Sequence, residues 1–202
     1  MKTSRASLPR IKAIALAVAT CFAATPWTTL HANPQTPQVV AGQAVFQQTG
    51  STLTVTNTPG AIINWQSFNI DRGELTRFVQ QNAASQVLNR VIGSADPSQI
   101  LGSLQSNGRV LLINPNGVVF GRGSQVDVAG LVVSSLNLSN EDFLGGKLRF
   151  TSNGTAGAVK TEGSIKTASG GSVVLIAPRR ENSGISQTPE GTILLAAGRS
   201  VE

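Results

Sequence analysis

The sequence predicts an all-β protein whose chain coils into a parallel β-helix. Three observations support this fold class. Short runs of Val, Ile and Leu alternate with turn residues over most of the chain, which is typical of many short strands. The run 110–113 is apolar at every position, as expected for a strand covered on both faces. Residues 172–177 and 192–197 repeat one pattern at a shift of 20, and such a period is typical of a solenoid built from stacked coils.

The start of the chain predicts a secretory signal peptide, residues 1–32. Residues 1–12 carry four basic side chains and no acidic one, and the apolar run 13–24 follows. This run is shorter than the roughly 20 residues that a membrane-spanning helix needs. We expect cleavage after Ala32, with a site near Ala24 as the alternative. A leader that remains attached as an anchor is the weaker interpretation.

Removal of this leader changes the charge and the chemistry of the chain. The sequence holds 16 basic and 10 acidic residues, and four of the basic ones lie in the leader, so the remainder is close to neutral. Nucleic-acid binding, which needs a concentrated basic face, is therefore not expected. The one cysteine, Cys21, and the one histidine, His31, also belong to the leader. The mature chain thus lacks the residues for disulfides, zinc or haem sites and thiol or imidazole catalysis, and we expect no metal and no cofactor.

After the leader, the chain begins with the cap that the open end of a solenoid needs. Residues 39–55 are the candidates, with alternating apolar and polar positions at 53–55. The stretch 96–104 begins like a helix, with Asp-Pro-Ser followed by apolar residues at helical spacing. However, Gly102 and the shortness of the stretch fit a strand of the solenoid equally well, so both interpretations stay open.

The central strands follow one another every five to eight residues. They are expected at 110–113, 118–120, 126–128 and 131–133. The corners between them are rich in Asn, Gly and Ser, which suit tight turns. Ile165 and Ile185 continue the shift of 20 seen in the tail. With about three strands in a coil of about 20 residues, the chain would form about eight coils, stacked about 4.8 Å apart. A leucine-rich repeat is the competing solenoid, but its Leu-x-x-Leu-x-Leu run is absent.

Four blocks of the sequence carry a more specific pattern. They are residues 61–70, 87–91, 104–110 and 112–121. The last block reads Leu-Ile-Asn-Pro-Asn-Gly-Val-Val-Phe-Gly. In order and spacing, from about Val39 to Leu144, they resemble the N-terminal domains of two-partner secretion exoproteins. That family includes filamentous haemagglutinin-like adhesins with a haemagglutination activity domain, secreted haemolysins and contact-dependent inhibition toxins.

This resemblance implies a fold, a function and a route. The fold would be a right-handed parallel β-helix, and the function would be to target a large, adhesin-like exoprotein for secretion, without catalysis. The leader would take the chain through the Sec translocon into the periplasm of a Gram-negative bacterium. There an outer-membrane barrel transporter with polypeptide-transport-associated domains would recognise it and export it to the cell surface or the medium.

The resemblance also suggests domain limits and an energy source. Residues 33–150 would be the secretion domain, and 151–202 the truncated start of a longer repeat region, beyond which sites for host glycans or proteins would lie. Because no nucleotide is present at the outer membrane, folding outside the cell, worth about 5–15 kcal/mol, would drive export. We expect Val119→Asp to stall secretion by disrupting a strand.

The Asn-Pro-Asn-Gly motif is the first candidate site. Asn114, Pro115, Asn116 and Gly117 suit a β-turn, so they form either a structural corner or a surface that the transporter recognises. A second motif of the family, Asn-Pro-Asn-Leu, is absent, and residues 135–144 stand in its place. This departure leaves the contacts with the transporter open.

Trp65, Asn89 and Arg90 are the other candidates. Trp65 is the one tryptophan after the leader, and we expect it to pack in the core or the cap rather than stack on a sugar. Arg90, which follows Asn89, is expected to pair with an acidic residue or to reach the transporter.

A polysaccharide-binding or polysaccharide-cleaving protein is the alternative function, because parallel β-helices also carry such enzymes. Those enzymes need clustered carboxylates. Here Asp71, Asp96 and Asp127 are scattered, and the adjoining pair Glu141 and Asp142 would point to opposite faces of a strand. We therefore expect no catalytic residues.

Overall fold

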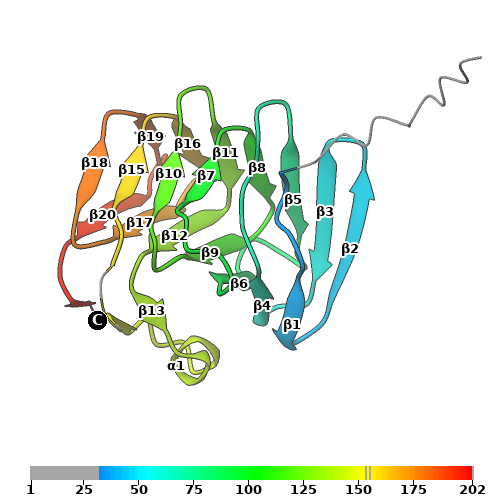
Figure 1. Ribbon diagram of the computed structural model, residues 1–202, viewed down its shortest axis with the longest axis horizontal. Coiled ribbons are helices and arrows are strands. Elements are labelled where there is room, and N and C mark those ends of the chain that lie inside the picture. Colours follow the sequence, from blue (N-terminus) through cyan, green and yellow to red (C-terminus); the bar gives the residue numbers. More distant parts are fainter. Residues whose placement is uncertain (1–31, 153, 155, 202) are drawn as a thin grey trace, which may run out of the picture. The chain divides into compact units, whose positions relative to one another are not determined.

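Twenty-one strands and one short helix make up the part of the chain that the computed structural model describes, residues 32–152, 154 and 156–201 (Figure 1). In chain order the elements are β1 (Gln38–Ala41), β2 (Ala44–Thr49), β3 (Thr52–Asn57), β4 (Ala61–Trp65), β5 (Leu75–Val79), β6 (Gln86–Val91), β7 (Ser98–Ile100), β8 (Ser103–Ser106), β9 (Arg109–Ile113), β10 (Val118–Phe120), β11 (Gln125–Val128), β12 (Gly130–Ser134), β13 (Asn137–Leu138), α1 (Asn140–Leu144), β14 (Phe150–Thr151), β15 (Val159–Thr161), β16 (Ser164–Thr167), β17 (Ser172–Ile176), β18 (Arg180–Asn182), β19 (Ile185–Gln187), β20 (Thr192–Ala196) and β21 (Ser200–Val201). Among these residues, no helix has the length and apolar character to cross a membrane. The predicted signal peptide, apart from Ala32, lies outside the described residues.

Three sheets of mostly parallel strands wind through successive coils (Figure 1). The first sheet has the order β1-β4-β6-β9-β12-β17-β20, the second β7-β10-β15-β18 and the third β2-β3-β5-β8-β11-β16-β19. One coil runs from β9 through β10 and β11 to β12, which returns to the first sheet beside β9. The predicted parallel β-helix is therefore confirmed, and these four strands agree with the predicted central strands to within one residue.

The number of coils is smaller than expected. In the first sheet β4, β6, β9, β12, β17 and β20 pair in parallel, which gives six coils rather than about eight. The early coils are longer than 20 residues, since Ala61 lies opposite Val87, 26 positions on. The step from Leu131 to its partner Val173 takes 42 positions. In that step residues 135–158, called the excursion below, leave the coil.

The predicted shift of 20 residues in the tail is correct for the first sheet and wrong for the third. Ser172 pairs with Thr192 in the first sheet, as the shift of 20 predicts. In the third sheet, however, Ile165 pairs with Ser186, and Ile185 lies opposite Ser164 with 62% of its surface exposed. The shift there is 21 because the corner before β20 is one residue shorter than the corner before β17.

Antiparallel strands close the N-terminal end of the solenoid. β1 pairs with β4 and β2 pairs with β3 in antiparallel fashion, which confirms the cap predicted in this region. The stretch 96–104 forms β7 and the start of β8 and contains no helix. A Cβ at Gly102 would lie 2.2 Å from the carbonyl oxygen of Asp71, so glycine permits a close approach of neighbouring coils here.

Two hydrophobic clusters cover the two faces of the first sheet. Val110 and Leu112 point into the solenoid, where they join the larger cluster. Leu111 and Ile113 point outward and pack in the second cluster with Phe143 and other excursion residues. All four side chains of the strand are buried, which explains why the run 110–113 is apolar at every position.

The same alternation corrects one sequence-based expectation. On β10 the side chains of Val118 and Phe120 are buried, but Val119 points to the outer face and is half-exposed. Val119→Asp is therefore the wrong choice for disrupting a coil, and Phe120 is the position that a buried charge would disrupt.

The excursion forms a small structure of its own on the first sheet. β13 and β14 pair antiparallel, and β21, from the far end of the chain, completes this sheet by pairing with β14. Ser139 caps α1, because its Oγ accepts the backbone N–H of Asp142 at 3.0 Å. Glu141 and Asp142 lie in this helix and not on a strand as assumed, and two acidic residues in a first turn suit the helix dipole.

Candidate functional site

The Asn-Pro-Asn-Gly motif forms the corner between β9 and β10. The backbone N–H of Gly117 donates to the carbonyl of Asn114 at 2.9 Å, which closes a β-turn. The Oδ1 of Asn114 accepts the backbone N–H of Asn116 at 2.9 Å. The Nδ2 of Asn114 donates to the carbonyl of Asp96 and to the Oγ of Ser98, each at 3.1 Å. The buried first residue of the motif therefore joins its own turn to the corner of the preceding coil.

The end of the excursion, just before β15, packs on the other side of this corner. The carbonyl of Pro115 accepts the N–H of Gly157 at 2.8 Å. Gly117 has a φ of +107°, and a Cβ at this residue would lie 2.4 Å from the carbonyl oxygen of Ala158. A glycine is required on both counts. The motif is thus built into the stack from both sides, which favours a structural role for Asn114 and Gly117.

Trp65 and Asn89 lie in the core. The Nε1 of Trp65 donates to Oδ1 of Asn89 at 2.9 Å, and Nδ2 of Asn89 donates to the carbonyl of Leu111 at 3.3 Å. The indole also makes edge-to-face contacts with Phe46 and Phe68, at centroid distances of 5.6 and 5.7 Å. Both residues are buried, so Trp65 offers no surface on which a sugar could stack.

Arg90 connects the first sheet to the excursion. Its Nη2 donates to the carbonyl of Leu138 at 2.6 Å, and its Nη1 lies 3.4 Å from Oδ1 of Asn64. The Nε is buried and has no hydrogen-bond partner. Burial lowers the pKa of Arg90 from its usual value, but a guanidinium group stays protonated. The partners found for this cation are neutral groups, where the sequence suggested an acidic residue.

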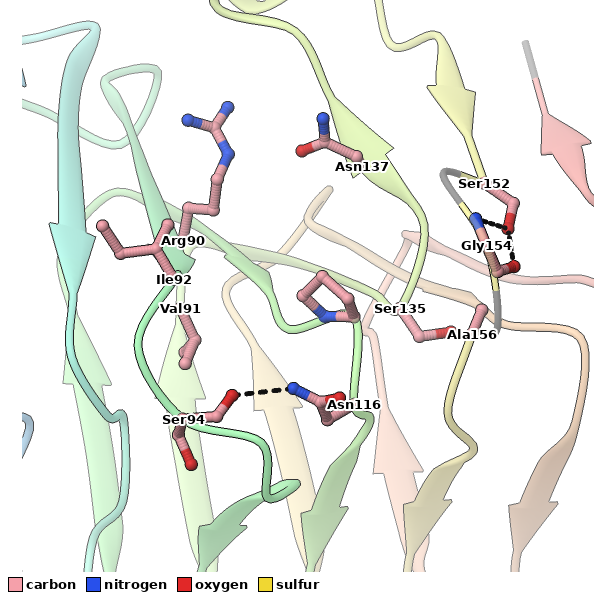
Figure 2. A pocket seen from close by; sticks show the side chains of 11 residues that line it. Arg90, Val91, Ile92, Ser94, Asn116, Ser135, Asn137, Ser152, Gly154 and Ala156 are labelled. Atoms are coloured by element: carbon pink, nitrogen blue, oxygen red, sulfur yellow. Dashed lines mark hydrogen bonds between the residues drawn. The ribbon is translucent and has the colours of Figure 1, made fainter.

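A groove of about 360 Å³ opens between the end of β6, the motif corner and the excursion (Figure 2). Its lining includes Arg90, Ile92, Ser94, Asn116, Ser135 and Asn137. Asn116 Nδ2 donates to the carbonyl of Ser94 at 2.8 Å across one wall. The Oγ of Ser135, like Nε of Arg90, is buried without a partner. Both atoms are covered by protein, so the lining that a ligand can reach consists of the more exposed groups, among them Ile92, Asn116 and Asn137.

The structure separates the predicted site residues into three groups. Arg90, Pro115 and Asn116 line the groove, Asn114 and Gly117 lie inside the motif corner, and Trp65 and Asn89 lie in the core. The excursion residues of the groove, such as Ser135 and Asn137, were missed. Their one signal in the sequence was the departure of 135–144 from the family pattern. Within the described residues, no three Asp, Glu, His or Cys side chains are grouped as metal ligands would be.

The sequence model of the TPS secretion domain, where TPS stands for two-partner secretion, matches residues 30–202. The chain belongs to this family. The structure of this TPS domain is similar to the crystal structure of the HMW1 secretion domain from Haemophilus influenzae, with a TM-score of 0.81 and 37% identity. That match covers 83% of this chain and 45% of the HMW1 chain.

Two curated relatives, both named heme/hemopexin-binding protein and both from H. influenzae, are 33% identical to this TPS domain. The matches cover 94% and 64% of this chain but 22% and 14% of the relatives, so the chain spans about a fifth of their length or less. Domains of this family are secretion modules rather than enzymes. This chain is accordingly a secretion-targeting module of a two-partner secretion exoprotein, whose partner is an outer-membrane transporter.

Proposed function

We propose that the groove beside Arg90 is the surface by which the cognate transporter recognises this TPS domain in the periplasm. The accessible part of its lining carries the polar side chains of Asn116 and Asn137. Ile92, at the same groove, exposes 59% of its surface. A strand or loop of a polypeptide-transport-associated domain would supply carbonyl acceptors and an apolar side chain to this combination.

The proposed route begins with the leader and ends outside the cell. Residues 1–32 direct the chain through the Sec translocon, the groove is recognised in the periplasm, and the barrel exports the chain to the surface. Folding of the coils outside would hold the exported part there, since a domain of this size gains about 5–15 kcal/mol. Residues 33–150 are proposed as the secretion domain and 151–202 as the start of the repeat region, and recognition through the groove would also use Ser152 and Ala156 from the start of that second part.

The activity of a longer exoprotein would reside beyond these coils. The match covers only about a fifth of the first curated relative, which leaves most of such a protein outside this domain. We propose that this downstream part is adhesin-like and binds host glycans or proteins. Relatives named for heme and hemopexin binding support a host ligand of that kind as a second possibility for the downstream part.

Ile92→Asp is the direct test of the groove. The full chain and its transporter are produced together, and the fraction of chain in the medium is measured against the fraction in the periplasm. A new charge at this exposed position is expected to leave the fold intact and to reduce export about tenfold, because it would be desolvated against the transporter.

Val45→Asp is the matched control. Val45 is 68% exposed on β2 and does not line the groove, so export of this variant is expected to equal that of the wild type. Normal export of Ile92→Asp would refute recognition through the groove. If Val45→Asp stalls instead, the free edge of the cap is the docking surface.

A further inference from the structure

The buried carboxylate of Glu74 lies beside Ala32. The backbone N–H of Ala32 donates to Oε1 of Glu74 at 2.8 Å, and the N–H of Asp71 donates to Oε2 at 2.9 Å. Glu74 exposes only 7% of its surface. A carboxylate that is largely removed from water interacts more strongly with a charged donor than with a neutral amide.

The next residue is fixed in the solenoid by its side chain. Asn33 is 1% exposed, its Nδ2 donates to the carbonyl of Ser51 at 3.1 Å, and its Oδ1 accepts the hydroxyl of Thr76 at 2.9 Å. Ser51 lies just before β3 and Thr76 lies in β5, so these bonds connect Asn33 to two neighbouring strands of the third sheet. They hold the peptide bond between residues 32 and 33 beside Glu74.

We propose that Glu74 is the receptor for the α-ammonium group that removal of the leader creates at Asn33. The proposal rests on the cleavage predicted after Ala32. Hydrolysis of that peptide bond consumes one water molecule, releases Ala32 as a carboxylate at the end of the leader, and leaves an ammonium group on Asn33. The N–H of Ala32, a neutral donor to Oε1, departs with the leader, and a cation on the adjacent residue takes its place. A charge-assisted hydrogen bond is about twice as strong as a neutral one.

An order of events follows from the burial of Asn33. A protease needs an extended and accessible segment, which the docked residue does not present. Cleavage must therefore precede the docking of these first residues, and the charge that it creates then favours docking. Removal of the leader and completion of the N-terminal end of the solenoid are coupled in this way.

The test uses the full chain, exported to the periplasm so that the leader is removed by the cell. Mass spectrometry of the first peptide should identify Asn33 as the N-terminal residue. The rate at which acetic anhydride acetylates this α-amine at pH 7 is then measured on the folded protein. A paired ammonium group does not react, so the wild type is expected to react about tenfold more slowly than Glu74→Gln. The matched control, Glu162→Gln, removes an exposed acid and should keep the wild-type rate.

Any other first residue, or equal acetylation rates in the wild type and Glu74→Gln, would overturn the proposal. If Glu74→Gln does not fold, the comparison is made on the wild type alone. Its α-amine should react about tenfold more slowly in the folded protein than in urea, relative to the lysine side chains of the same sample. Equal relative rates in the two states would also overturn the proposal.

Discussion

Asn114→Ala tests whether the Asn-Pro-Asn-Gly motif is a structural corner. The side chain of Asn114 makes three hydrogen bonds, to the carbonyl of Asp96, to the hydroxyl of Ser98 and to the backbone N–H of Asn116. Each contributes about 1 kcal/mol to the free energy of unfolding, and Ser98 would be left buried without this partner. The substitution is therefore expected to lower the free energy of unfolding by about 3 kcal/mol.

The expected effect is large enough to measure by thermal unfolding followed by circular dichroism. For a domain of this size, 1 kcal/mol changes the Tm by about 2–4 °C, so Asn114→Ala should lower the Tm by about 6–12 °C. Asn116→Ala is the matched control within the motif. Its half-exposed side chain donates one hydrogen bond, to Ser94, and the expected loss is about 1 kcal/mol, or about 2–4 °C.

Two results for Asn114→Ala would contradict this reasoning. An unchanged Tm for Asn114→Ala would mean that the three bonds contribute nothing to the corner. A chain that keeps its Tm but is no longer exported would assign Asn114 to recognition by the transporter. Loss of export by Asn116→Ala at an unchanged Tm would assign recognition to the exposed part of the motif alone.

Two further substitutions test the stacking of the coils. Gly117→Ala should lower the free energy of unfolding by about 2–4 kcal/mol, because its Cβ would meet the carbonyl of Ala158. Gly50→Ala is the control: its Cβ would meet nothing within 4 Å, so the loss should be about 1 kcal/mol, caused by the positive φ alone. Equal Tm values for these two variants would contradict the close approach. Phe120→Asp should prevent folding and export because it buries a charge, while Val119→Asp should fold and be exported, as circular dichroism and secretion assays would show. Export of Phe120→Asp would refute the inward orientation of its side chain.

The central coil could be predicted because local signals mark both its strands and its corners. The residues from 110 to 133 alternate short apolar runs with Asn and Gly corners, and each strand pairs in parallel with a strand one coil away. The register of the tail was harder to predict, because the loss of one residue in the corner before β20 changes the partner of Ile165, although both corners are short and end in glycine.

The excursion and the groove could not be predicted in the same way. Residues 135–158 have no periodicity that reports their fold, and the pairing of Phe150 with Val201 joins positions that are far apart in sequence. The sequence carried two traces of the excursion: the departure of residues 135–144 from the family pattern, and the apolar outer face of 110–113, which needs a cover. Arg90 was identified as a candidate, but its acceptor is the backbone carbonyl of Leu138, and a backbone carbonyl leaves no signature in the sequence.

The pairing of β14 with β21 has a consequence for the timing of assembly. Coils that stack on their predecessors can form one after another as a chain emerges from a channel, but the small sheet of the excursion needs two segments about fifty positions apart. Until both have emerged, β14 has one neighbour only, and the cover on the outer face of the first sheet is incomplete. The excursion would therefore complete its sheet late in export. Once β14 and β21 have paired, a chain could move back into the pore only after this pairing is broken.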